Sequence, residues 1–314
     1  MKSNLLSALF LMMSLSTFAQ NENDKKVFLD SLWRETTSDY KYFRIIKNYN
    51  LVQDEYQFED YYKSGNLQMR GMSISNETLI EKGGFTFFHE NGNIKQIISY
   101  ENGVPVGNTI SYYENGKKKF DGEYLKNDKN LKIAGPLKIE SYWNPNNEQT
   151  VINGNGFFKD EADNEVSEGN LKNGLKTGVW KGTSATYKLS FTESYENGTL
   201  ISGESTDETG EKHKYDKIFE QPEPTKGFGD FYKFVGANFL IPEDEPVNAR
   251  LMVGFVVNKD SSVSNVNVVK SINSALDKEG IRIVSLYKGW GVGKFRGIIV
   301  RTSFTIPIKI VVED

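Results

Sequence analysis

The sequence contains no cysteine and only two histidines, His89 and His213. The lack of cysteine excludes disulfide bonds, thiolate ligands for zinc, thiol nucleophiles and lipid attachment at an N-terminal cysteine. Two histidines far apart in the chain leave little material for a histidine-based metal site or a catalytic triad. We therefore expect no metal ion, no cofactor and no enzymatic activity.

Positive charge is also scarce, because 38 lysine and arginine residues are outnumbered by 42 acidic residues, which gives a net charge of −4. Affinity for nucleic acid rests largely on lysine and arginine side chains that neutralise phosphates. This balance argues against a nucleic-acid partner. A length of 314 residues is enough for two domains.

Long apolar runs are absent except at the N-terminus, where residues 5–15 follow Lys2. This run is shorter than the ~20 residues that a membrane-spanning helix needs. Thr17 and Ala19 are small residues at the positions that precede a cleavage site, so residues 1–19 are typical of a signal peptide removed before Gln20. The sequence thus predicts a periplasmic or cell-envelope protein. An uncleaved anchor, which would give membrane contact, is the alternative.

Residues 20–60 are rich in aromatic side chains and are expected to form a β-rich segment. Within it, residues 41–49 predict a strand, and residues 26–34 fit either a strand or a short helix.

From residue 61 to about 210 the sequence repeats an aromatic strand, a turn that ends in glycine, and a second strand. The clearest copies of the turn are residues 61–65, 87–92, 112–116 and 195–198. Asn-Gly is a strong hairpin signal because a type I′ turn needs positive φ at both central residues. Gly92 and Gly116 lie about 24 residues apart, and such a period indicates stacked hairpins that bury their faces on one another. The array is predicted to span residues 61–218.

These turns, together with the Gly-x-x-x-Gly-x-Trp pattern of residues 174–180, resemble MORN-type repeats, in the variant seen in bacterial antitoxin-like repeat proteins. The resemblance covers about half of the chain and implies a scaffold of β-hairpins. We interpret the aromatic side chains as core between the repeats. The charged stretches 120–132 and 159–167 are expected to be insertions.

Residues 219–226 hold Pro222 and Pro224 among acidic and polar residues, a composition typical of a stiff, extended linker. Residues 227–314 then predict a small α+β domain. It begins with a helix over 228–239 and continues with two strands, 250–258 and 263–270. The fold class expected for the whole chain is therefore mostly β, with a repeat array followed by a two-helix, three-stranded antiparallel sheet domain.

The end of this domain carries the strongest pattern in the chain. Ser274 is expected to cap a helix over 277–288, and a glycine-rich corner at 289–294 follows. Residues 297–310 alternate apolar and polar positions, which predicts a long strand with one buried face. Pro307 cannot donate to a ladder, so part of this strand is expected at a sheet edge.

The order of strand, turn, strand, helix, corner and strand resembles the TonB C-terminal domain family over residues 227–314. The corner contains Trp290, as the family pattern has an aromatic residue there. Ser261 stands where the family turn usually has glycine, and Val292 where its corner usually has proline. In that family the domain spans the periplasm, transmits force and pairs with a short strand of an outer-membrane receptor.

The resemblance implies that a partner peptide adds to the last strand by β-augmentation. The residues that would hold it are Val300, Arg301, Thr302, Ser303, Phe304 and Thr305. Main-chain groups would supply most of the affinity. The same edge offers a route to a homodimer.

We therefore expect a non-enzymatic exported protein that binds an extended peptide and is linked to TonB-type transport across the outer membrane. Two alternatives stay open. One is a structural scaffold of the cell envelope, and the other is an antitoxin-like inhibitor that acts through the repeat face.

Overall fold

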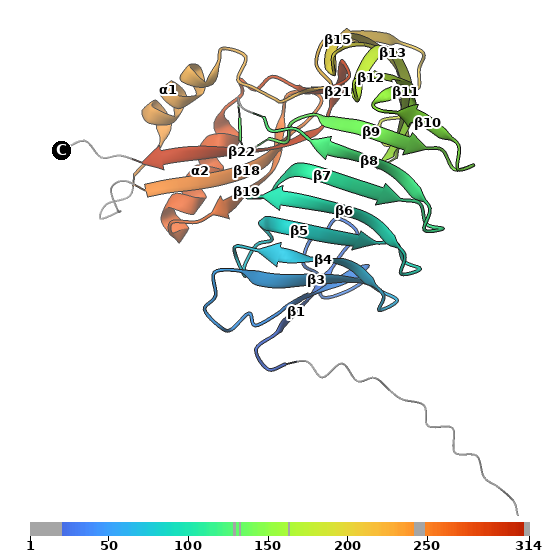
Figure 1. The fold of residues 1–314 in the computed structure, drawn as a ribbon. Coiled ribbons are helices and arrows are strands. Elements are labelled where there is room, and N and C mark those ends of the chain that lie inside the picture. The colour runs from blue at the N-terminus through green and yellow to red at the C-terminus, as the bar shows by residue number, and fades with distance from the viewer. Residues whose placement is uncertain (1–20, 128–129, 132, 163, 242–248, 311–314) are drawn as a thin grey trace, which may run out of the picture. The chain divides into compact units, whose positions relative to one another are not determined.

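The computed structural model describes residues 21–127, 130–131, 133–162, 164–241 and 249–310 (Figure 1). The signal peptide predicted for residues 1–19 lies outside the described residues. No helix among the described residues is long and apolar enough to cross a membrane. The chain divides between Gln149 and Thr150 into two compact units, and this division falls inside the stretch 61–218 expected as one array.

The first unit is a run of antiparallel strands in which each strand hydrogen-bonds with the next along the chain. Its strands are β1 (Lys25–Leu29), β2 (Tyr42–Ile46), β3 (Tyr56–Tyr62), β4 (Leu67–Ser73), β5 (Glu81–Phe88), β6 (Ile94–Glu101), β7 (Val104–Tyr112), β8 (Lys118–Tyr124) and β9 (Leu137–Trp143). The segment 26–34 therefore begins as a strand, not as a helix.

The second unit opens with the same arrangement. Its sequential antiparallel strands are β10 (Gln149–Ile152), β11 (Asn155–Ala162), β12 (Glu165–Lys172), β13 (Leu175–Ser184), β14 (Leu189–Glu196), β15 (Thr199–Thr206) and β16 (Lys212–Tyr215). The described residues of the stretch 159–167, expected as an insertion, instead belong to the β11–β12 hairpin. Lys159, Asp160, Glu161 and Glu165 lie on its regular strands.

The Asn-Gly turns are of two kinds. At Asn102-Gly103, Asn153-Gly154, Asn173-Gly174 and Asn197-Gly198, φ is positive at both residues. These are the tight two-residue loops that the type I′ geometry predicts. Glu101 pairs with Val104 across the first of them, so the strands continue to the turn without a gap.

The remaining Asn-Gly pairs depart from this prediction. At Asn91-Gly92 only the glycine has positive φ, at 89°. The loop is longer, because the amide of His89 donates to the carbonyl of Asn93 at 2.8 Å. The Asn91 side chain accepts from the Asn93 amide at 3.0 Å, and the strand register shifts beside the turn at Phe88. This is a bulged hairpin, so the type I′ prediction is wrong here.

The longer turns are joined to one another by side-chain hydrogen bonds. The Asn66 amide donates to the Glu90 carbonyl at 2.7 Å, and the Asn91 amide donates to the Glu114 carbonyl at 2.8 Å. These bonds span 24 and 23 residues, which is the period of the repeat. Asparagine therefore serves twice in this array, once to form a turn and once to bond to the next turn.

Aromatic rings fill the interior between strands, as the sequence predicts. Phe58, Phe85 and Trp180 are at most 1% exposed. Several of the rings lie over a glycine of the neighbouring strand, where any side chain would collide with them. The pairs are Gly71 with Phe85, Gly169 with Trp180, Gly182 with Phe191 and Gly203 with Tyr215. A strand glycine is thus part of the packing pattern, because the absence of a side chain leaves room for the ring of the neighbouring strand.

The C-terminal part of the second unit contains two helices and two small sheets. The elements are β17 (Phe219–Glu220), α1 (Phe228–Asn238), β18 (Ala249–Val257), β19 (Val263–Lys270), α2 (Ser274–Leu286), β20 (Gly293–Phe295), β21 (Ile298–Val300) and β22 (Thr302–Ile310). The strand orders are β17-β20-β21 and β19-β18-β22, and all pairs are antiparallel. The helix predicted over 228–239 is confirmed as α1.

The helices pack on one face of the β19-β18-β22 sheet around a common apolar core (Figure 1). Phe231 of α1, Leu276 of α2 and Trp290 are at most 1% exposed in this core. The cap of α2 differs from the prediction. Asn273, not Ser274, is the N-cap, and its side chain accepts from the amides of Ala275 and Leu276.

The segment expected as a linker is extended but paired. Phe219 pairs with Phe295, and Pro224 forms a bridge with Trp290. The Gly291 amide also donates to the Glu223 carbonyl at 2.7 Å. Residues 219–225 thus run alongside the glycine-rich corner, which holds the corner in place.

Candidate functional site

The candidate site is the outer edge of β22, the strand that carries most of the predicted partner-binding residues. In the sheet order β19-β18-β22, the described strands give β22 one neighbour, β18. The two strands pair from Val257↔Thr302 to Ala249↔Ile310 with no shift of register. The predicted single strand over 297–310 is interrupted, since Gly297 lies in a turn and Arg301 separates β21 from β22.

Pro307 shows which main-chain groups face outward. Its carbonyl accepts a hydrogen bond from the Tyr232 hydroxyl of α1 at 3.2 Å, and proline has no N–H to give to β18. In an antiparallel ladder the N–H and C=O of one residue point to the same side, and the side alternates along the strand. The main-chain groups of Ser303 and Thr305 therefore also point away from β18.

The side chains of the six predicted residues differ in exposure. Those of Arg301, Ser303 and Thr305 are exposed, those of Val300 and Thr302 are buried, and that of Phe304 is half-buried. The Phe304 ring lies 6.3 Å from that of Phe228 and 5.8 Å from that of Trp290, so it belongs to the core.

Val300 and Arg301 differ from the other four because they precede β22. Val300 is in β21 and pairs with Gly293. The Arg301 guanidinium donates to the Asn258 side chain at 3.0 Å. The structure thus places Thr302, Ser303, Phe304 and Thr305 on one continuous edge strand. Among these four residues, the main-chain groups that point outward are those of Ser303 and Thr305.

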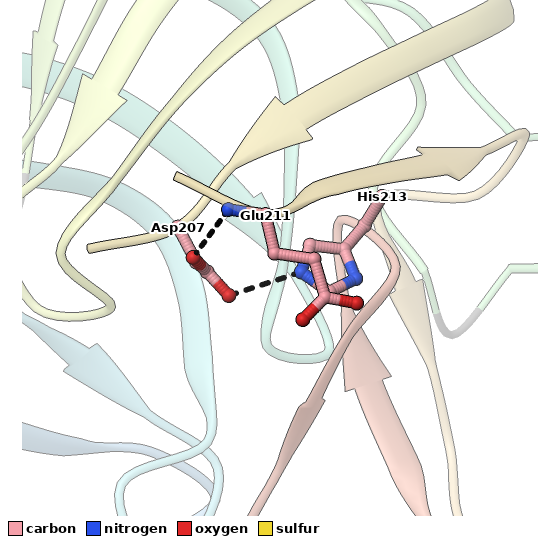
Figure 2. Close-up of side chains that lie close together, drawn as sticks. All are labelled: Asp207, Glu211 and His213. Carbon is pink, nitrogen blue, oxygen red and sulfur yellow. Dashed lines mark hydrogen bonds and ion pairs between the residues drawn. The ribbon is translucent and has the colours of Figure 1, made fainter. Parts of the chain in front are cut away.

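A cluster of possible metal ligands lies in the β15–β16 hairpin (Figure 2). One donor atom from each of Asp207, Glu211 and His213 lies within 4.8 Å of the others. This grouping was not predicted from the sequence, in which the two histidines lie far apart. The signal was an acid-rich turn that ends in His213.

The oxygens of Asp207 are already engaged in this turn. One accepts from the Thr209 hydroxyl at 2.7 Å, the Thr209 amide at 2.9 Å and the Glu211 amide at 3.0 Å. The other lies 3.1 Å from Nε2 of His213. Hydrogen bonds from the Thr209 hydroxyl and from His213 lower the pKa of Asp207 below its ordinary value. These contacts account for the cluster as a stabilised turn.

Comparison with known families identifies part of the array. The MORN repeat variant family matches residues 83–102 and 105–126. Each match covers one hairpin, β5–β6 and β7–β8, with a bulged turn at its centre. No curated protein matches the chain. The chain therefore contains MORN-type repeats, as the sequence predicted, in the region where the turns at Gly92 and Gly116 are spaced most regularly.

Proposed function

We propose that the protein is an exported, non-enzymatic binding protein whose last strand pairs with an extended segment of a partner protein. The observation that carries this proposal is the open edge of β22 at Ser303 and Thr305. Each of these residues offers one N–H and one C=O to an incoming strand. Such groups at a sheet edge are the template for β-augmentation.

Helix α1 limits where the partner can bind. The Tyr232 hydroxyl occupies the carbonyl of Pro307, so the strand is already covered there. The available stretch runs from Thr302 to Thr305. Arg301 and Lys309, both exposed, lie beyond its two ends. An extended segment with acidic residues near its ends suits this edge best.

The order of elements supports a TonB-like role for this domain. A strand, a turn, a second strand, a helix, an aromatic corner and an edge strand follow one another as β18, β19, α2, Trp290 and β22. Ser261, which stands where the family turn has glycine, adopts φ of 65°, the left-handed conformation that favours glycine. On this proposal the partner is a segment of an outer-membrane receptor, and the role lies in transport across the outer membrane.

Cysteine crosslinking in intact cells of the native host tests the proposal, because the natural chain has no cysteine to give background. Ser303→Cys places a thiol on the exposed side of β22. The matched control is Lys270→Cys on β19, the strand at the other edge of the same sheet. We expect Ser303→Cys, and not Lys270→Cys, to crosslink to an extended segment of another protein.

Two results would overturn the proposal. One is equal crosslinking from the two positions, which would show no preference for the β22 edge. The other is a crosslink from Ser303→Cys to a second copy of the chain alone, which would show that dimerisation closes the edge. A crosslink to an outer-membrane receptor would support the transport role in particular.

A further inference from the structure

The tip of the β20–β21 hairpin carries a buried arginine. Phe295 pairs with Ile298, so Arg296 and Gly297 form a two-residue turn, with φ of 49° and 79°. A residue at the tip of a hairpin is usually in solvent, yet Arg296 is only 3% exposed. The tip is buried because it lies against the repeat strands of the same unit.

The guanidinium of Arg296 meets two carboxylates and one ring. Nη1 and Nη2 donate to the two oxygens of Glu165 at 2.7 and 2.8 Å, and Nε donates to Glu193 at 2.7 Å. Its central carbon lies 3.6 Å from the centre of the Phe191 ring. These contacts are therefore specific for the planar shape of the guanidinium as well as for its charge.

The receiving carboxylate of Glu193 is held by groups of the repeats themselves. Tyr195 and Tyr215 donate their hydroxyl protons to its two oxygens at 2.9 and 2.8 Å. Glu193 is 1% exposed. Burial, and then the nearby Glu193 carboxylate, raise the pKa of both tyrosines, so both stay protonated donors. Two tyrosine hydroxyls of the repeats therefore hold Glu193 in addition to Arg296.

The charges explain why the site needs a cation. Glu165 and Glu193 bring two carboxylates to one guanidinium. Burial opposes the charge on Arg296, but the hydrogen bonds from Glu165 and Glu193 raise its pKa above the usual range. Without the guanidinium, the buried carboxylate of Glu193 would lose its closest cation and would face the partly exposed carboxylate of Glu165, which is unfavourable.

Main-chain contacts fix the same turn. The Ser205 hydroxyl donates to the Arg296 carbonyl at 2.7 Å, and the Arg296 amide donates to the Ile218 carbonyl at 2.7 Å. Strands β12, β14 and β15 of the array therefore all contribute side chains that contact this one residue.

We propose that Glu165, Glu193 and Phe191 form a guanidinium-binding site on the repeat sheet, and that Arg296 is the ligand that docks the β20–β21 hairpin onto it. The site is a receptor built by the repeats and filled by a separate segment of the same chain. Emptied of Arg296, it should bind a free alkylguanidinium. This inference does not depend on what β22 binds.

Chemical complementation of full-length Arg296→Ala tests the proposal. We expect the variant to melt at a lower temperature than the natural protein and to exchange the amides of β20 and β21 faster. Ethylguanidinium at low millimolar concentration should restore part of both losses and bind saturably by calorimetry. Urea, a neutral planar molecule of similar size, should not, and the natural protein should not bind ethylguanidinium in this way.

Arg296→Lys separates shape from charge, because lysine keeps the charge but lacks the planar fork. We expect it to stay close to Arg296→Ala in amide exchange. If Arg296→Ala does not fold, Glu165→Gln in the otherwise natural chain serves instead, with faster exchange expected at the same amides. The proposal is wrong if folded Arg296→Ala shows no saturable ethylguanidinium binding, if urea rescues equally well, or if Arg296→Lys or Glu165→Gln exchanges like the natural protein.

Discussion

The ring of Phe85 lies over Gly71 so closely that a Cβ atom at position 71 would be 2.3 Å from the ring. Phe85 is 1% exposed, so its ring is enclosed by other protein atoms. We therefore expect Gly71→Ala to lower the free energy of unfolding by about 1–3 kcal/mol through overpacking. Urea denaturation followed by tryptophan fluorescence measures this change.

Gly84→Ala is the matched control, since Gly84 lies in neighbouring β5 and has nothing within 4 Å of a built Cβ. It should leave stability unchanged or raise it by up to about 1 kcal/mol. Equal losses in the two variants would show that glycine in these strands serves the backbone and not the packing.

Ser261 is strained in the turn between β18 and β19, where its φ is 65°. Ser261→Gly should raise the free energy of unfolding by about 0.5–1 kcal/mol, because the relief of left-handed strain exceeds the entropy that glycine costs. Chemical denaturation gives the value. The neighbouring change Ser262→Gly should have the opposite sign, as it removes side-chain hydrogen bonds with Asp260 and Asn258.

Thr305→Pro removes an N–H that points away from β18 and leaves the ladder with β18 intact. We expect partner binding to weaken about tenfold or more, because the partner strand loses the hydrogen bond that the Thr305 N–H would donate to it. Stability should hardly change, since Pro307 already occupies an equivalent position two residues on. The measurements are crosslinking yield at Ser303→Cys and the thermal midpoint.

Ile306→Pro provides the contrast on the same strand. Its N–H faces β18, so its loss should cost about 1–3 kcal/mol of stability. If Thr305→Pro destabilises as strongly as Ile306→Pro, the assignment of outward-facing groups is wrong.

Acid should weaken the β15–β16 hairpin through Asp207. The pKa of this carboxyl is lower in the folded protein than its ordinary value of 3.8, chiefly because of the Thr209 hydroxyl and then His213. Its contribution to stability is therefore present above that value and is lost as pH falls below it. Between about pH 5 and pH 2, the natural protein should lose more stability than Asp207→Asn. Asp216→Asn, an exposed control, should follow the natural protein.

Much of the array follows from the sequence because its signals are local. The period of the glycine turns predicted the stacked hairpins, and the matching MORN repeats confirm them at residues 83–126. The turn type was harder to predict. Asn102-Gly103 and Asn91-Gly92 share the same dipeptide, but only the second lies in a bulged loop that also bonds to the Glu114 carbonyl of the next turn. That choice depends on a neighbour some 23 residues away.

The Arg296 site was missed because its parts are distant in sequence. Glu165 is 131 residues from Arg296, which lies between the corner predicted at 289–294 and the strand predicted over 297–310. A local signal was nevertheless present. In β14 the buried positions alternate as Leu189, Phe191, Glu193 and Tyr195, so a carboxylate stands where the pattern calls for an apolar side chain. A carboxylate at a buried position of a strand needs a hydrogen-bonding or charged partner, although the sequence does not identify that partner.

The candidate edge was partly predictable. Pro307 indicated an edge strand, and β22 is one among the described strands. The break at Arg301 was not predicted, because period-2 alternation continues through it from Ile298 to Ile310. Alternation indicates which face of a strand is buried, but it does not indicate which sheet the strand belongs to. β21 and β22 both alternate, although they belong to different sheets.

The bonds from Asn66 to Glu90 and from Asn91 to Glu114 connect each of these longer turns to the next one along the chain. Nothing in this scheme fixes the number of hairpins. A segment of one period can be duplicated or deleted and the turns on either side can still bond to each other. Gene variants that differ by a whole hairpin should therefore fold, whereas a loss of half a period should disrupt every contact across the junction.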